Sequence, residues 1–121
     1  MKFFIEILIA LIAIEHLLIL WLEMFAWETA GKKVFKGALP KELFAPTRVL
    51  AANQGLYNGF LAAGLIWSFF IENLEWKNNI ALFFLICISI AGIYGSLKAS
   101  KKIFWILAFP ALIGVLAILL S

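Results

Sequence analysis

The only histidine of the chain and three of its glutamates lie within one apolar stretch, residues 3–25, where few other polar side chains occur. Glu6, Glu15, His16 and Glu23 must each be neutralised, paired or solvated if this stretch crosses a lipid bilayer. A carboxyl group at such a depth can exchange a proton for a cationic solute, and an imidazole beside a carboxyl can act as acid and base. These residues are therefore the first candidates for a functional site.

The spacing of these residues divides them between faces of the expected helix. At 100° per residue, His16 and Glu23 share one face, and Trp27 returns to the same stripe. Glu15 points about 100° away from His16, and Glu6 lies about 80° to the other side. We therefore expect His16 and Glu23 to face a neighbouring helix together, with Glu15 and Glu6 on its flanks.

A second apolar run supplies the polar partners that this face needs. Four of its polar side chains gather on or near one side: Asn53, Gln54, Tyr57 and Asn58. If the two helices pack antiparallel, we expect His16 to form a hydrogen bond with Asn58 or Tyr57. Glu23 is expected to reach one of three side chains: Arg48, as an ion pair, Gln54 or Asn53.

Small residues recur every four positions on another face of the second run. They are Ala51, Gly55, Gly59 and Ala63. Such a row lets a second helix approach closely, which drives helix association in lipid, where the hydrophobic effect gives little. The pattern predicts tight packing and leaves open whether the partner is internal or another copy, and we expect a homo-oligomer.

Composition sets the class of the protein. With 65% hydrophobic and 14% charged residues, the 121-residue chain has too few polar groups to cover a water-soluble core. Four apolar runs are long enough to span about 30 Å of hydrocarbon as helices: residues 3–25, 49–71, 80–97 and 103–120. The alternation typical of membrane β-strands is absent. We therefore predict an all-α membrane protein with a single domain, a compact bundle of four transmembrane helices over residues 1–121.

The basic residues predict how this bundle is oriented. Eight of them occur in the two connections after the first and third runs: Lys32, Lys33, Lys36, Lys41, Arg48, Lys98, Lys101 and Lys102. Only Lys2 and Lys77 occur on the other side. The bias places loops 26–47 and 98–102 in the cytoplasm and both termini outside the cell (inner) membrane. The long basic loop 26–47 is expected to lie among anionic headgroups, and no nucleic-acid partner is expected, because the basic residues flank spans.

Other signals for chemistry are sparse. The single basic residue before the first run, and the carboxylates inside it, argue against a cleaved signal peptide, so we expect this helix to be retained. Cys87 stands alone, which rules out an internal disulfide and is typical of packing. The chain contains no phosphate-binding glycine loop, paired-histidine zinc motif or nucleophile elbow, so no metal site and no cofactor are predicted.

Particular residues also resemble a known family. His16, the run 23–25 with Trp27, and the block NQGLYNGFLAAG at residues 53–64 closely resemble the small bacterial membrane family called domain of unknown function 1304. The resemblance covers essentially the whole chain and implies a four-helix integral membrane protein with no assigned activity. It also implies a glutamine before the proline of the last run, where this chain has Phe109.

Three functions are consistent with these residues. We prefer transport or binding of a small cationic or polar solute, coupled to a proton, through a polar site between the first two helices. Glu15 or Glu23 would carry the exchange, with His16, Asn58 and Gln54 along the path. The alternatives are an intramembrane or lipid-modifying enzyme using His16 and Glu23, and a structural or partner-organising protein in which these groups only join helices.

Overall fold

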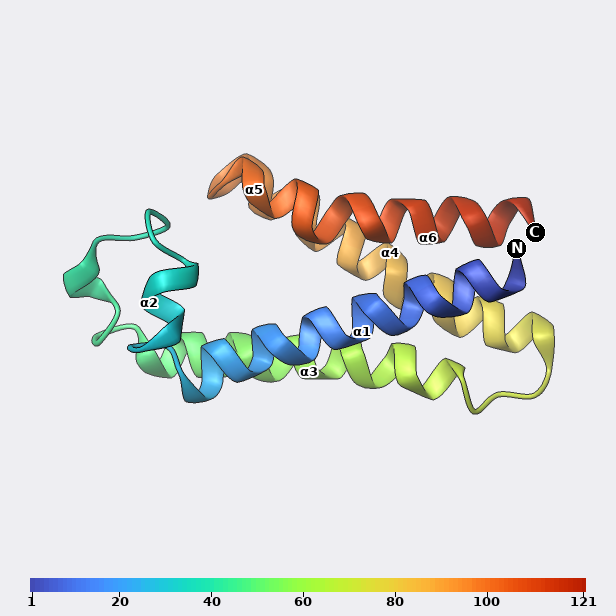
Figure 1. The fold of residues 1–121 in the computed structure, drawn as a ribbon, viewed down its shortest axis with the longest axis horizontal. Helices are drawn as coiled ribbons and strands as arrows, with labels where there is room; N and C mark the ends of the chain where they lie inside the picture. The colour runs from blue at the N-terminus through green and yellow to red at the C-terminus, as the bar shows by residue number, and fades with distance from the viewer.

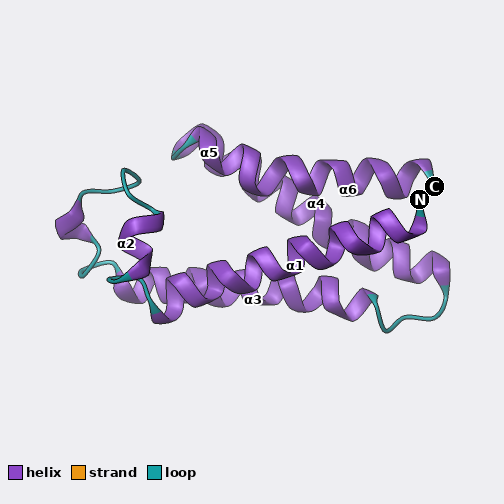
Figure 2. Ribbon diagram, in the orientation of Figure 1, coloured by secondary structure: helices purple, strands orange, loops and turns teal.

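The structure is a computed structural model that describes residues 1–121, and it is built from helices and loops without strands. Four long helical segments follow one another along the chain. They are α1 (Lys2–Phe25), α3 (Arg48–Ser68), α4 (Leu74–Lys98), and a last segment made of α5 (Lys101–Ile103), η2 (Phe104–Ala108) and α6 (Phe109–Leu120). Two short helices, α2 (Ala30–Val34) and η1 (Lys41–Leu43), interrupt the loop between α1 and α3, which Figure 2 shows as the longest connection. The predicted all-α class is confirmed.

Three of the four long segments have the length and apolarity that crossing a membrane requires. They are Lys2–Phe25, Leu74–Lys98 and Lys101–Leu120. At 21 residues α3 is long enough to span, but it is less apolar, since Asn53, Gln54 and Asn58 lie within it. The structure thus supports a membrane protein with three clear spans rather than the four equivalent ones that we expected.

The boundary between the second and third segments differs from the prediction. α3 ends at Ser68, three residues before the expected end, and α4 begins at Leu74, six residues before the expected start. The side chain of Asn73 caps α4 by accepting a hydrogen bond from the backbone of Trp76 at 3.0 Å. Polar residues in the first turns of α4 concealed this start, because apolarity was the criterion for a span.

The segments pack as an antiparallel bundle whose core lies toward the chain termini. In Figure 1, α1 runs along α3, α4 passes behind α1, and α6 lies beside α4 and the start of α1. Apolar side chains from all four segments meet in one cluster, with Ile12, Leu65, Leu85 and Ala111 nearly inaccessible to solvent. Both termini lie at one end, and loop 26–47 and α5 lie at the other.

The last segment changes its helical pitch just before Pro110. In η2 the backbone N–H of Phe109 donates to the carbonyl of Phe104, a π-type bond that spans five residues. Proline lacks an N–H and crowds the preceding turn, so a wider turn at this point accommodates it. The altered turn brings η2 against α4, where the backbone of Ala108 touches Gly92 so closely that a Cβ at Gly92 would lie 2.7 Å from the Ala108 nitrogen.

Candidate functional site

Glu23 and Asn58 join α1 to α3. Asn58 Nδ2 donates to Glu23 Oε1 at 2.7 Å and also to the backbone carbonyl of Gln54 at 3.2 Å. Glu23 is only 6% exposed, so this bond satisfies a carboxyl that is otherwise enclosed by protein. Gly55 makes the approach possible, because a Cβ there would lie 3.0 Å from the Cβ of Glu23. The pair is therefore an interhelical connection built into a tight contact.

His16 lies in the same interior but makes a different contact from the expected one. It is 1% exposed, and its Nδ1 lies 2.9 Å from the carbonyl of Ile12 in its own helix. The expected hydrogen bond to Asn58 or Tyr57 was wrong, and the ring of Tyr57 instead lies against Phe60 on an exposed face of α3.

The physical reason is the register of the two helices. We expected His16 to be level with Asn58, whereas Asn58 meets Glu23 and Gly59 meets Leu20. This register differs from the expected one by about one to two helical turns. Leu20 occupies the space that the missing side chain of Gly59 leaves, and this contact aligns the helices.

Arg48 also has a different partner. Its Nη1 lies 3.7 Å from Glu28 Oε2, beyond the end of α1, and not beside Glu23 as expected. Asn53 and Gln54 are exposed on the outer side of α3, so they do not join the Glu23 contact through their side chains. Of the polar residues predicted to form one cluster, the structure brings only Glu23 and Asn58 together.

The row of small residues is used mainly within the chain. Gly55 and Gly59 face α1, where added Cβ atoms would collide with Met24 and Leu20 respectively. Ala51 is buried beside Trp27, but Ala63 is exposed. The internal partner that the sequence left open is thus α1 for the middle of the row, and one end of the row remains on the surface.

Glu15 lines a separate, largely apolar cavity of about 250 Å³, called the Glu15 crevice below. Apart from Glu15 its walls come from α1, the end of α2 and the start of the last segment: Leu18, Ile19, Leu22, Val34, Phe35, Ile103, Ile106 and Leu107. Glu15 Oε1 is buried without a hydrogen-bond partner and lies 4.0 Å from His16 Nδ1. A second cavity of about 360 Å³ shares four of these wall residues and is also lined by Lys36 and Lys102.

The wall of the Glu15 crevice could not be found from residue types alone. Its members are aliphatic or aromatic, and they come from three segments that are distant in sequence. One feature of the sequence did indicate a separate environment for Glu15, since the helical wheel places Glu15 on a different face from His16 and Glu23. Neither His16 nor Glu23 lines any of the four principal cavities, and no group of three or more His, Cys, Asp or Glu side chains is arranged as metal ligands.

Glu6 occupies a third environment near the chain termini. It lines a cavity of about 310 Å³ together with Lys2, Lys77, Asn78 and Ser121, among others. The three glutamates of α1 therefore lie at three different places: an apolar crevice, an interhelical contact and a polar cavity at the end of the bundle. Only Glu15 combines an apolar cavity with a buried oxygen that has no partner.

Comparisons with known proteins agree on the family. The model of the family described as "Protein of unknown function (DUF1304)" matches residues 10–119. The chain is also similar to the uncharacterised protein YpaA of Lactococcus lactis, with 35% identity over 98 residues that cover 80% of this chain and 81% of YpaA. No solved structure matches the chain. The resemblance noted in the sequence is thereby confirmed, and the chain belongs to the DUF1304 family.

Proposed function

We propose that this protein binds and transports a small solute with a cationic or hydrogen-bonding group, and that Glu15 is the carboxyl that holds it. The observation that carries the proposal is the buried Glu15 oxygen without a partner at the wall of the Glu15 crevice. A buried polar group without a partner costs about 1–3 kcal/mol, and a solute that supplies a donor or a positive charge recovers this cost.

The shape and chemistry of the cavity define the solute further. Ligand sites are usually lined by apolar side chains with a few polar groups that fix orientation. The Glu15 crevice has one ionisable group among aliphatic and aromatic walls, which favours a solute with an apolar body and one polar or cationic end. Its volume of about 250 Å³ lies just below the usual range of ligand pockets, about 300–1,000 Å³, and so suits a small solute.

Coupling to protons follows from the use of a single carboxyl group. A proton and a cationic solute compete for the same oxygen atoms, so the release of one accompanies the binding of the other. The solute would enter between α1 and η2 from the hydrocarbon, because Lys36 and Lys102, which line the adjacent cavity, repel cations.

In this proposal the residues between α1 and α3 position the site and do not line the path. Glu23 and Asn58 hold α1 against α3, and thereby fix the direction in which Glu15 points. No observation favours the alternative of an enzyme using His16 and Glu23. His16 Nδ1 bonds its own helix, Glu23 bonds Asn58, and neither lines a principal cavity.

We also propose four membrane crossings, with loops 26–47 and 98–102 in the cytoplasm of a bacterial cell and both termini outside. The eight basic residues in or directly next to these loops, Arg48 included, against two at the other end support this orientation. α3 would be the fourth crossing, and a second copy would cover its outer face, where Gln54, Tyr57 and Ala63 are exposed. This arrangement makes the protein a homo-oligomer.

Binding of a lipophilic cation to the purified protein tests the proposal. We expect saturable binding of 2-phenylethylammonium, an apolar body with one ammonium end, in detergent by calorimetry, and weakening by about tenfold or more in Glu15→Gln, since hydrogen bonds to charged groups contribute about 1.5–3 kcal/mol. Glu6→Gln is the matched control and should bind as the wild type does. In proteoliposomes, Glu15→Gln should also abolish cation-driven proton movement. Equal affinity of wild type and Glu15→Gln, or no saturable binding at all, would refute the proposal.

A further inference from the structure

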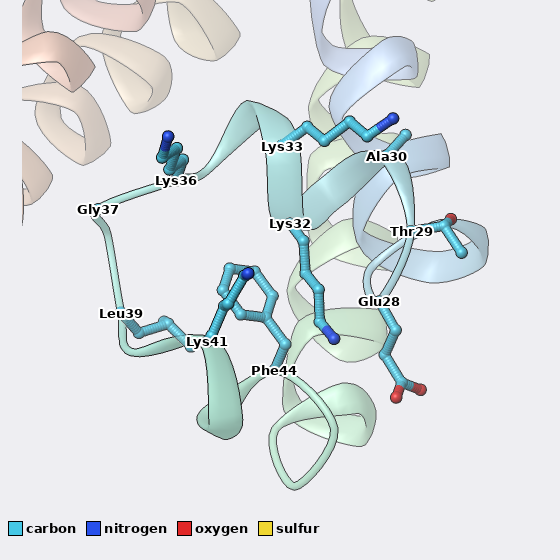
Figure 3. A pocket seen from close by; sticks show the side chains of 10 residues that line it. All are labelled: Glu28, Thr29, Ala30, Lys32, Lys33, Lys36, Gly37, Leu39, Lys41 and Phe44. Carbon is cyan, nitrogen blue, oxygen red and sulfur yellow. The ribbon is translucent and has the colours of Figure 1, made fainter.

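The loop between α1 and α3 encloses a cavity of about 1000 Å³, called the loop cavity below (Figure 3). Its lining is unusually basic and comprises Glu28, Thr29, Ala30, Lys32, Lys33, Lys36, Gly37, Leu39, Lys41 and Phe44. In Figure 3, Lys32 and Lys41 project from two sides of the loop toward its interior, and Lys36 lies at the far edge next to Gly37. The cavity is distinct from the Glu15 crevice.

A small aromatic core holds the loop in this shape. Trp27 and Phe44 are both buried, with ring centroids 4.8 Å apart, and Phe35 lies 5.4 Å from Trp27. The indole N–H of Trp27 also donates to Thr47 Oγ1 at 3.1 Å, which ties the end of α1 to the start of α3. The aromatic core therefore fixes the backbone that carries the lysines, which lowers the conformational entropy lost when a ligand binds.

The positive charge around the loop cavity is not compensated within the protein. None of its four lysines forms an ion pair, and its one carboxylate, Glu28, lies 3.7 Å from Arg48. Ammonium groups of one sign around a concave surface raise the local potential and attract anions. Leu39 and Phe44 are apolar members of the lining, so the cavity suits a ligand that joins a negative group to apolar atoms.

We propose that the loop cavity binds the phosphate headgroup of an anionic phospholipid. Its position supports a lipid source, because it lies at the same end of the bundle as α5, where the long helices end and headgroups would be found (Figure 1). Basic residues next to a membrane span are the usual contacts of such headgroups. This inference goes beyond the proposed function and does not depend on Glu15.

Two triple variants with the same change in charge test the proposal. Lys32→Gln, Lys36→Gln and Lys41→Gln remove three ammonium groups from the cavity. Lys98→Gln, Lys101→Gln and Lys102→Gln, as the matched control, remove three from the other loop at the same end. Binding of phosphatidylglycerol and phosphatidylcholine to each purified protein in detergent is measured by native mass spectrometry. Circular dichroism and gel filtration establish that each variant is folded.

We expect the wild type to bind phosphatidylglycerol at least about tenfold more tightly than phosphatidylcholine, and the cavity variant to lose this preference. The control variant should keep the preference for phosphatidylglycerol. If the glutamine variant of the cavity does not fold, a variant with arginine at the three cavity positions is measured instead, and it should still bind phosphatidylglycerol. An equal loss in both glutamine variants would show diffuse surface charge and overturn the proposal. Glycerol 3-phosphate binding as tightly as phosphatidylglycerol would overturn the lipid assignment and identify a soluble phosphate ligand.

Discussion

Paired substitutions at Glu23 and Asn58 distinguish an interhelical connection from a solute-binding carboxyl. Asn58→Leu removes the donor and leaves the enclosed Glu23 carboxyl without its partner, which should cost about 1–3 kcal/mol of unfolding free energy. Glu23→Met should cost less than about 1 kcal/mol, because Asn58 Nδ2 retains the carbonyl of Gln54 at 3.2 Å. Replacing both partners by apolar groups of similar size should come within about 1 kcal/mol of the wild type.

The resulting coupling energy of about 1–2 kcal/mol lies at the upper end of the range measured for interhelical hydrogen bonds in membrane proteins. Unfolding in mixtures of dodecyl maltoside and sodium dodecyl sulfate, followed by circular dichroism, gives the four free energies. Gln54→Leu is the control, because Gln54 takes part only through its backbone, and its stability should be unchanged. Additive single effects, or a larger cost for Glu23→Met than for Asn58→Leu, would refute this account of the contact.

Four further substitutions test other contacts. Gly92→Ala should destabilise the protein by about 1–2 kcal/mol in the same unfolding assay, because overpacking against the backbone of Ala108 costs about 1–3 kcal/mol and exceeds the helix-propensity gain of up to about 1 kcal/mol. Gly59→Ala, which meets only the end of a leucine side chain, should be nearly neutral, and equal effects at the two glycines would contradict the packing argument. Trp27→Ala should open the aromatic core of the loop and accelerate trypsin cleavage in residues 26–47, with an unchanged cleavage rate as the contrary result. Glu15→Leu should raise the unfolding midpoint while abolishing cation binding, whereas a lower midpoint would indicate that Glu15 stabilises the bundle.

The sequence was sufficient for the helical class and for most of the spans. Apolar runs of the right length correspond to α1, α4 and the last segment, because apolarity over about 20 residues is a direct requirement of the bilayer. The same criterion misplaced the start of α4, whose first turns are polar and whose true start signal is the cap at Asn73. The apolarity criterion also predicted α3 as a span equivalent to the others, although α3 is less apolar.

The candidate site was harder to predict from the sequence than the helices, because it depends on how the helical segments align with one another. The helical wheel separated Glu15 from His16 and Glu23 correctly in direction, but it carries no information about register between helices. The alignment of α1 with α3 depends on Leu20 entering the space beside Gly59, and this contact places Asn58 next to Glu23. The walls of the Glu15 crevice depend in addition on where α2 and the last segment meet α1.

Glu15 and Glu23 show why an ionisable residue in a membrane helix does not by itself indicate function. Both lie in α1, eight positions apart; Glu23 is buried, and Glu15 is partly buried. Asn58 meets the carboxyl of Glu23, and the close approach at Gly55 fixes that contact, so Glu23 has little capacity left for a ligand. Glu15 has a buried oxygen without a hydrogen-bond partner, and its residue lines an apolar cavity. The missing hydrogen bond is a cost that folding alone does not explain. Glu15 is therefore the candidate for binding a solute because its buried oxygen lacks a hydrogen-bond partner, and not merely because it is an ionisable residue in a membrane helix.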